Sequence, residues 1–495
     1  LFSDGSKREH EVTRYGTEQD AKYALLQEKP SLHFQAEPTG IENSISIYPD
    51  QPQQRIQGLG ASMTDASAWV LHELKKNTPD LYSFVMAQLF TEKGAGFSML
   101  RRPVGASDYT ATKNSYTYQD DKDHFTIEHD KQYILPILRE AKRLNPAIKI
   151  IGSPWSAPAW MKTNQDLNGI KKKQKIAGKQ NRLKPDCYDA YADYFINYLN
   201  AYAAEGITVD AVTLQNEPQF DAAHYPCMRM TVGDQIRFVK TLGPKLKAAG
   251  LKTEIFVHDH NWVLHPNDKK IVGGDQKIDP YTLVKQIYSD SEAADYVAGS
   301  SWHCYSGKST EMQRVYQKLR KEFPEKKIYT TEATGWREYS KKEWAGSCNW
   351  GLKNNWLGSL AAGSSVAMQW NVALDHQHGP TTRNDSLAIG LVTVNTETWK
   401  SAKFEREFYC MAQVSKAARP GSVRLKHTIH GGGNHVLVLP TQRPDGSFAL
   451  VVNNQNKAPR SFEIQFRERF LELTVAGNSI QTLTWTRPAS PNDHH

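Results

Sequence analysis

Short apolar runs alternate with longer amphipathic stretches between about residues 56 and 400 of this 495-residue chain. Such an alternation predicts βα units and a parallel sheet. The runs that we interpret as strands cover residues 56–60, 97–101, 148–152, 212–217, 253–257, 296–300, 328–332 and 366–371. Eight strands with helices between them predict an α/β fold, a (β/α)8 TIM barrel in which some connecting loops carry insertions.

Apolar side chains recur at helical spacing between these strands, in residues 132–144, 186–204 and 232–248. The second of these stretches carries a stripe made almost entirely of aromatic rings: Tyr188, Tyr191, Phe195, Tyr198, Leu199 and Tyr202. A row of rings can serve as a platform for sugars. Because a barrel helix buries one such stripe against the strands, we interpret this stripe as core.

The pattern changes after about residue 404, where a helix over 404–418 is followed by strictly alternating segments. Turn sequences separate predicted strands at 435–439, 448–453, 461–466, 470–475 and 480–485. Short strands at 32–34 and 45–48 are expected to pair with them, because a lone hairpin is unstable. The predicted domains are therefore N-terminal strands in 1–50, a barrel in 51–405 and a small antiparallel β-sandwich completed by 406–495.

Composition narrows the function classes only slightly. The formal net charge is +8, but no arginine-rich helix or nucleic-acid motif accompanies it, so we expect no nucleic-acid partner. No apolar run is long enough to span a bilayer, and no signal-peptide core follows Leu1, so we expect no obligatory membrane insertion.

The five cysteines show no metal-binding spacing and leave one or two disulfides possible. The lysine-rich stretch 162–184 is expected to be a solvated loop on the rim after the third strand, with an anionic surface as the alternative.

Two glutamates end predicted strands of the barrel. Glu217 ends the fourth strand within Gln215-Asn216-Glu217-Pro218, and Glu332 ends the seventh strand before Ala333. The reactive groups of TIM barrels lie at the C-terminal ends of the strands. Hydrolysis of a glycosidic bond requires two carboxyl groups, closer together in retaining enzymes than in inverting ones. The sequence therefore predicts a glycosidase site but not its stereochemistry.

Six motifs follow one another between about residues 56 and 400. They are Gly58-Leu59-Gly60-Ala61-Ser62-Met63-Thr64-Asp65-Ala66, Ser153-Pro154-Trp155-Ser156-Ala157-Pro158-Ala159-Trp160-Met161-Lys162-Thr163, Gln215-Asn216-Glu217-Pro218, Trp302-His303-Cys304-Tyr305, Thr331-Glu332-Ala333 and Gln369-Trp370-Asn371. These motifs and their order resemble glycoside hydrolase family 30, the family of glucosylceramidases and β-1,6-glucanases. The flanking strands are similar to that family's side sandwich.

The resemblance implies a retaining β-glycoside hydrolase that acts on a β-glucoside or β-glucan without metal or organic cofactor. Glu217 would be the general acid and then the general base, and Glu332 would be the nucleophile that forms a covalent glycosyl-enzyme. Negative charge on Glu332 is expected to raise the pKa of Glu217 and keep it protonated. Polymer-degrading relatives imply a secreted or periplasmic enzyme, and we expect a monomer.

The resemblance also implies a set of substrate-binding residues. Asn216 would hydrogen-bond the 2-hydroxyl group, Tyr305 would bind the nucleophile and His303 would line the site. Asp65, Trp155 and Trp370 would hold the other hydroxyl groups of a glucosyl unit, although core packing is an alternative for both tryptophans. Asn384 is expected to reach the sugar as well. Cys304 stands where animal glucosylceramidases have an aromatic residue, which leaves the aglycone open.

Three alternatives remain beside a β-1,6-glucanase or a glucosylceramidase-like β-glucosidase. A xylanase belongs to another branch of the same family. A catalytically silent carbohydrate-binding barrel would lack a carboxylate, and both are present here. An enzyme of phosphorylated metabolites would need a glycine-rich anion site after the last strands. His258 and His260 flank Asp259 in a spacing that invites a metal, but we interpret them as hydrogen-bonding residues.

Overall fold

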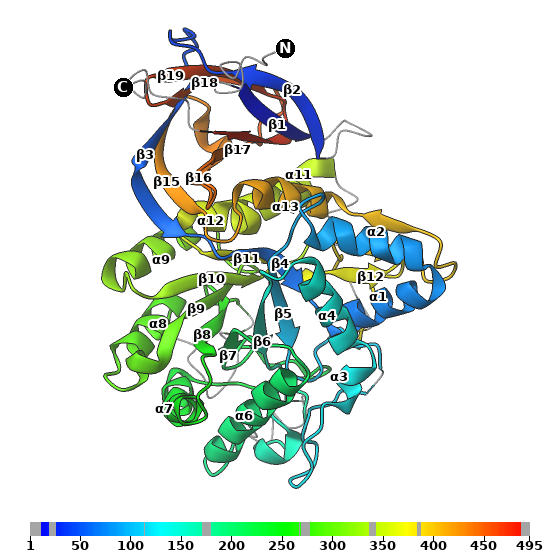
Figure 1. Ribbon diagram of the computed structural model, residues 1–495. Coiled ribbons are helices and arrows are strands. Elements are labelled where there is room, and N and C mark those ends of the chain that lie inside the picture. Colours follow the sequence, from blue (N-terminus) through cyan, green and yellow to red (C-terminus); the bar gives the residue numbers. More distant parts are fainter. Residues whose placement is uncertain are drawn as a thin grey trace.

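The computed structural model describes residues 11–18, 26–112, 114–170, 180–266, 268, 278–335, 343–383 and 388–486. Two units are visible in Figure 1, a barrel and a smaller β-structure at one end of it. The predicted Asn384 and the middle of the lysine-rich stretch, residues 171–179, lie outside the described residues.

Eight parallel strands close into a barrel in the order β10-β11-β4-β5-β6-β7-β8-β9 (Figure 1). They are β4 (Gly58–Ser62), β5 (Met99–Pro103), β6 (Lys149–Ser153), β7 (Ala211–Thr213), β8 (Glu254–Asn261), β9 (Val297–His303), β10 (Lys327–Glu332) and β11 (Val366–Asn371). Each corresponds to a predicted strand, so the TIM-barrel prediction is confirmed. The fourth differs in length, because the chain leaves the ladder after Thr213 and Glu217 lies in the following loop.

Helices surround the barrel (Figure 1). The longer ones are α1 (Asp65–Asn77), α2 (Pro79–Phe90), α4 (Ile134–Leu144), α6 (Tyr188–Ala204), α7 (Val232–Ala248), α8 (Pro280–Ser289), α9 (Ser309–Glu322), α11 (Glu343–Gly351) and α13 (Arg406–Ala417). Short ones are α3 (Glu128–Gln132), α12 (Gly358–Ala362) and the π-turn η5 (Leu352–Trp356). The aromatic stripe of α6 is buried, which confirms that it belongs to the core.

The smaller unit is a nine-stranded sheet in the order β19-β18-β3-β15-β16-β17-β20-β1-β2, folded over its own core (Figure 1). Its strands are β1 (Glu11–Glu18), β2 (Gln27–His33), β3 (Ser44–Arg55), β15 (Val423–His430), β16 (Val436–Gln442), β17 (Phe448–Asn454), β18 (Arg460–Phe466), β19 (Arg469–Val475) and β20 (Ser479–Trp485). The expected pairing of N-terminal with C-terminal strands is confirmed by the β1–β20 and β3–β15 ladders. The sequence missed β1 and β15, whose alternation is interrupted by polar residues.

Helix α13 lies between the two units and contacts both of them. It packs against β17 and β20 of the sandwich and against β4 and α11 of the barrel. The predicted boundaries at residues 50 and 405 stay predictions. Within the part of the chain that the structure describes, no helix has the length and apolar character needed to cross a membrane. All five cysteines are buried free thiols, so the possible disulfides do not form here.

A buried ion pair fastens β5 to the neighbouring helices. The guanidinium of Arg102 lies 3.0 Å from the carboxylate of Asp130, and both side chains are fully buried. Asp130 also accepts hydrogen bonds from the hydroxyl groups of Tyr118, at 2.6 Å, and Tyr202. A buried charge that loses its partner is strongly destabilising.

Replacing Arg102 with methionine should therefore lower the free energy of unfolding by about 3–5 kcal/mol, because Asp130 would remain buried without its cation. Urea unfolding followed by circular dichroism measures the loss. The exposed pair of Lys76 with Glu73 provides the matched control, and Lys76→Met should change the free energy by less than about 1 kcal/mol. Equal effects of the two substitutions would contradict the assigned importance of the buried pair.

Candidate functional site

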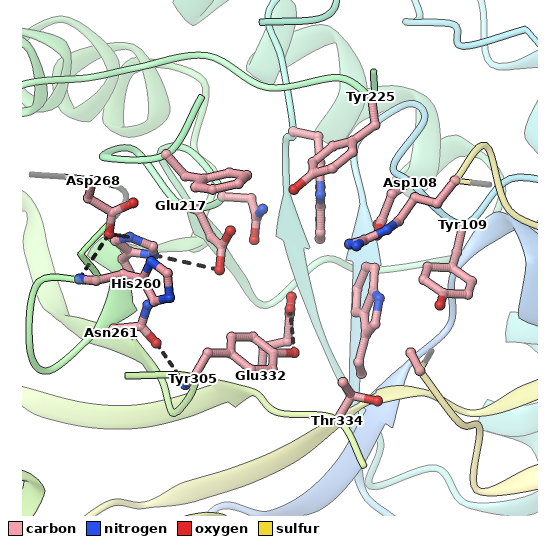
Figure 2. Close-up of a pocket in the computed structure, with 17 residues that line it drawn as sticks. Asp108, Tyr109, Glu217, Tyr225, His260, Asn261, Asp268, Tyr305, Glu332 and Thr334 are labelled. Atoms are coloured by element: carbon pink, nitrogen blue, oxygen red, sulfur yellow. Dashed lines mark hydrogen bonds and ion pairs between the residues drawn. The ribbon is translucent and has the colours of Figure 1, made fainter. Parts of the chain in front are cut away.

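A pocket of about 190 Å³ opens at the C-terminal ends of the barrel strands (Figure 2). Of the predicted site residues, it brings together Trp155, Asn216, Glu217, Tyr305, Glu332 and Trp370. The other lining residues are Asp108, Tyr109, Phe220, Tyr225, His260, Asn261, His265, Asp268, Thr334, Arg383 and Ala388. Both glutamates that the sequence singled out therefore face one cavity.

Glu332 ends β10 and is held on both carboxylate oxygens. Oε1 accepts a hydrogen bond of 2.9 Å from the hydroxyl of Tyr305, and Oε2 accepts from the guanidinium of Arg101. Arg101 is fully buried at β5, beneath the pocket floor, and also donates to Asp259 at 2.8 Å and Asn216 at 2.7 Å. One buried cation thus connects the nucleophile candidate to two neighbouring strand ends.

Glu217 stands in a loop rather than on a strand. Its φ of 46° lies in the left-handed region, and its amide donates to the Asp259 carbonyl at 3.0 Å. Glu217 Oε1 lies 3.1 Å from His303 Nδ1 and 3.6 Å from His260 Nδ1. A non-glycine residue held in this conformation is characteristic of functional sites.

His303 ends β9, and His260 reaches Glu217 because β8 is irregular at its end. The pairing of β8 with β9 shifts between His258 and His260, and His258 and Asp259 both have positive φ. This bulge aims Asp259 down at Arg101 and His260 into the pocket. Each imidazole that faces Glu217 is backed by a carboxylate, His303 by Asp259 at 3.2 Å and His260 by Asp268 at 3.0 Å.

These contacts reverse one expectation from the sequence. Burial raises the pKa of Glu217, but the hydrogen bonds and charges of His260 and His303 lower it more, so its net direction is below the ordinary value. Burial lowers the pKa of His260, and its bonds to Asp268 and Glu217 raise it overall to about 10. Burial likewise lowers the pKa of His303, and the charge of Glu332 with the bonds to Asp259 and Glu217 raises it to about 9. The expected raised pKa of Glu217 is therefore wrong.

The ring nitrogens of His260 and His303 and a carboxylate oxygen of Glu217 lie within 4.8 Å of one another, close enough to share a cation. A metal needs neutral imidazole ligands. Both rings have raised pKa values, which disfavours metal coordination. His303 lies within hydrogen-bond distance of Glu217, whereas His260, at 3.6 Å, interacts with it through charge. His258 takes no part in the cluster, since its Nε2 bonds the Asn261 carbonyl at 3.0 Å.

Aromatic rings and one amide complete the middle of the pocket. Trp155 and Trp370 stack with centroids 4.9 Å apart, and the Arg101 guanidinium lies 4.7 Å from the first ring and 5.7 Å from the second. The side-chain oxygen of Asn216 accepts a hydrogen bond from Arg101. The atom facing Arg101 must be this oxygen, because a guanidinium group can only donate. The amino group of Asn216 is therefore the part left to donate to a ligand.

The structure does not bring Asp65 to the pocket. Its carboxylate accepts hydrogen bonds from the Ala111 amide at 2.6 Å and from the hydroxyls of Tyr116 at 3.0 Å and Tyr133 at 2.9 Å, and it pairs with His129. Asp65 thus anchors the segment that contains Ala111 and Tyr116. His303 also lies behind the pocket surface, fully buried against Glu217.

The loop that Asp65 anchors supplies the carboxyl group that the sequence analysis missed. Asp108 lines the pocket beside Arg383, at 3.9 Å. Burial raises the pKa of Asp108 to about 7, although the charge of Arg383 opposes this. Asp108 follows the end of β5 by five residues, so a search limited to strand ends could not find it. Carboxylates in the rim loops would have been the useful signal.

The beginning of the lysine-rich stretch is not a solvated loop. Lys162 is buried, and its ammonium group donates to the carbonyls of Leu167 at 2.7 Å and Cys227 at 2.9 Å. Burial lowers the pKa of Lys162 to about 8. This lysine ties together two rim loops beside the pocket.

Comparisons with known proteins agree with this geometry. Residues 56–417 match the glycosyl hydrolase family 30 TIM-barrel domain, and residues 421–483 match that family's β-sandwich domain. An endo-1,6-β-D-glucanase of Neurospora crassa is 30% identical over 503 residues, covering 96% of this chain and 95% of the relative. The lysosomal acid glucosylceramidase of Mus musculus is 25% identical, covering 98% and 90%. A solved structure of an endo-β1,6-glucanase has a TM-score of 0.82 at 28% identity, covering 96% of this chain and 99% of that chain. The chain therefore belongs to glycosyl hydrolase family 30 and is a retaining β-glycoside hydrolase.

Proposed function

We propose that this enzyme hydrolyses β-1,6-linked glucan by double displacement, with Glu332 as nucleophile and Glu217 as acid and base. The observation that carries the assignment is the contrast between their surroundings. Glu332 accepts from the Arg101 guanidinium and the Tyr305 hydroxyl, donors that bind a carboxylate strongly. Glu217 faces the imidazoles of His260 and His303, whose pKa values are raised. One group is therefore prepared to attack and the other to exchange protons.

In the first step, a Glu332 oxygen bonds to the anomeric carbon as the glycosidic bond breaks. The leaving oxygen takes a proton from Glu217. In the second step, Glu217 takes a proton from water, the hydroxide oxygen attacks the anomeric carbon, and Glu332 is released. The amino group of Asn216 donates to the 2-hydroxyl, a contact that strengthens in the transition state.

The proton for the first step comes from the imidazole of His303. With Glu217 ionised and His303 protonated, a proton shift along their 3.1 Å hydrogen bond produces a protonated Glu217 and a neutral ring. The neutral ring keeps a proton on Nε2, which donates a hydrogen bond to Asp259. Such a shared proton reconciles the lowered pKa of Glu217 with its role as an acid, because the pair retains one proton until His303 loses it.

The lining of the pocket supports a glucosyl unit next to a hydroxylated leaving group. Asp108 and Arg383 offer hydrogen-bond partners to the glucosyl hydroxyls at one end. At the Glu217 end, the lining includes the polar side chains of Asn261 and Asp268 (Figure 2). His265 lies beside Asp268, to which its amide donates at 3.2 Å. The hydrocarbon chains of ceramide need an exposed apolar surface. Among described residues, the only large hydrophobic side chain that is well exposed is Phe84, on α2 and outside this pocket.

The greater identity to the fungal endo-1,6-β-glucanase than to the glucosylceramidase supports the same choice. A polymeric glucan does not enter cells, so we propose that the enzyme acts outside the cytoplasm, as a secreted or periplasmic protein.

Substrate comparison tests this proposal. The enzyme should release glucose or gentio-oligosaccharides from β-1,6-glucan. It should be at least about 100-fold less efficient on glucosylceramide, because polar groups at the leaving-group end would lose their partners, and on xylan, because a xylosyl unit lacks the hydroxymethyl group of glucose. Product chromatography and kcat/KM for each substrate measure this preference. Preference for glucosylceramide would overturn the assigned leaving group, and activity confined to xylan would overturn the glucosyl unit.

Substituting each glutamate separates the two roles. Glu217→Ala should slow glucan hydrolysis by about 10²–10⁴-fold, yet it should still form the glycosyl-enzyme from an aryl β-glucoside with an activated leaving group. Added azide should then yield a β-glucosyl azide. Glu332→Ala should yield the α-azide, since azide enters from the vacant nucleophile side, and Glu332→Gln should abolish turnover. If Glu217→Ala instead gave the α-azide and Glu332→Ala the β-azide, the two assigned roles would have to be exchanged.

The pH dependence of kcat/KM tests the shared proton. With His303 present, the pair of Glu217 and His303 keeps its proton up to a pH near the raised pKa of His303, about 9. In His303→Gln, Glu217 loses its hydrogen-bonded proton donor, because His260 lies farther away, at 3.6 Å, and His260 still lowers the pKa of Glu217. The basic limb of the pH profile of kcat/KM should therefore move to lower pH. His258→Gln is the matched control, since His258 does not contact Glu217, and should leave the limb in place. An unmoved limb in His303→Gln would show that Glu217 holds its own proton.

A further inference from the structure

A second depression lies on the far side of the Asp108 end of the pocket. It is a groove of about 730 Å³, much larger than the pocket itself. Its lining comes from four rim loops and is formed mainly by amide, carboxyl, imidazole and hydroxyl groups. The side chains that carry them are Asn114, Ser115, Gln165, Asp166, Asn168 and His224.

The groove and the pocket share a wall of consecutive residues. Tyr225 and Arg383 line the pocket, whereas their neighbours His224 and Thr382 line the groove. The main chain of Asp108 belongs to the same wall, since its carbonyl accepts from Thr381 Oγ1 at 2.6 Å and from the Thr382 amide at 2.9 Å. The groove is therefore adjacent to the Asp108 end of the pocket.

The floor of the groove is fixed by buried polar contacts. The ammonium group of Lys162 holds the carbonyls of Leu167 and Cys227. A β-bridge joins Asn168 to Pro226, and the Gly169 amide donates to the Ala222 carbonyl at 2.6 Å. A surface that is ordered before binding loses less entropy when a ligand arrives.

The chemistry of the lining identifies the class of ligand. Amides, hydroxyls and an imidazole supply both donors and acceptors, which suits the hydroxyl groups of a sugar. Among the described residues of the lining there is no lysine or arginine, and Asp166 adds negative charge. The groove therefore suits a neutral, polyhydroxylated chain rather than an anion or a lipid.

We propose that this groove binds the glucan units on the non-reducing side of the unit held in the pocket. Glu217 and Asp108 stand toward opposite sides of the pocket (Figure 2). The leaving group departs at Glu217, so the chain continues from the glucosyl unit past Asp108. This inference rests on the proposed function, and it makes the enzyme an endo-acting one that cuts within a chain.

The β-1,6 linkage explains how a glucan chain passes over the wall between the pocket and the groove. In a β-1,6-glucan each unit is joined through a hydroxymethyl group, which adds one rotatable bond between consecutive rings. That bond lets the chain turn over Asp108 and Arg383 while the reacting ring stays in the pocket. A chain joined directly ring to ring lacks this hinge.

Aryl glycosides with a constant leaving group test the groove. We expect kcat/KM for release of p-nitrophenol to rise about tenfold from the β-glucoside to the β-gentiotrioside, the gain of one or two net hydrogen bonds in the groove. A wild-type enzyme whose kcat/KM is independent of glycone length would overturn this inference and leave the proposed glycosidase chemistry intact. Failure to hydrolyse any of these glucosides would instead overturn the proposed function.

Substitutions in the groove complete the test. His224 and Gln165 are exposed, so their replacement should leave the fold intact. The double variant His224→Ala/Gln165→Ala should lose most of the tenfold length effect, measured as the ratio of kcat/KM for the gentiotrioside to that for the glucoside. His124→Ala, an exposed histidine on the rim outside the groove, is the matched control and should keep the wild-type ratio. A double variant with an unchanged ratio would place the extra units elsewhere and overturn the inference.

Discussion

The buried guanidinium of Arg101 is the constraint on which the site depends. It is fully enclosed, and it donates to Glu332, Asp259 and Asn216 while stacking under Trp155 and Trp370. Removing such a cation from water is costly unless its charge is compensated by hydrogen-bonded partners. Its partners come from different strands and loops, so the barrel must close correctly before the charge is compensated. The same requirement that stabilises the closed barrel therefore fixes the nucleophile candidate.

The second carboxyl group is governed by a different device. Among the described residues, no hydrogen bond joins Glu217 to Arg101. Glu217 faces two imidazoles instead. Each ring is oriented by a carboxylate behind it, Asp259 or Asp268. Asp259 belongs to both systems, because it accepts from Arg101 on one oxygen and from His303 on the other. One buried aspartate thus connects the group that attacks with the group that moves the proton.

Polar anchors away from the reacting atoms shape the surrounding cavity. Asp65 holds the loop that presents Asp108, and Lys162 holds two loops that border the groove. Both are charged side chains buried among hydrogen-bond partners, as buried charges require. Neither touches the pocket, yet the position of its walls follows from them. The shape that selects a substrate is therefore set at a distance from the chemistry.

The sequence by itself determined the barrel, the sandwich and the two glutamates. Periodicity is a local property, and eight apolar runs such as residues 148–152 with helices between them admit few other folds. The approximate position of Glu217 and Glu332 at the rim followed from the same count. The resemblance to family 30 added Trp155, Trp370, Asn216 and Tyr305, all of which line the pocket.

Only the tertiary structure decided the partners of these residues. Asp65 lies within a recognisable motif but does not line the pocket. Asp108 lines the pocket from a loop without a recognisable pattern. The bulge in β8 reverses which side chains face the cavity, and no periodicity reveals a one-residue insertion in a strand. The pKa of Glu217 likewise depends on two histidines from other strands. Hydrogen bonding and electrostatic interactions between distant segments depend on atomic distances, and these exist only after the barrel has closed.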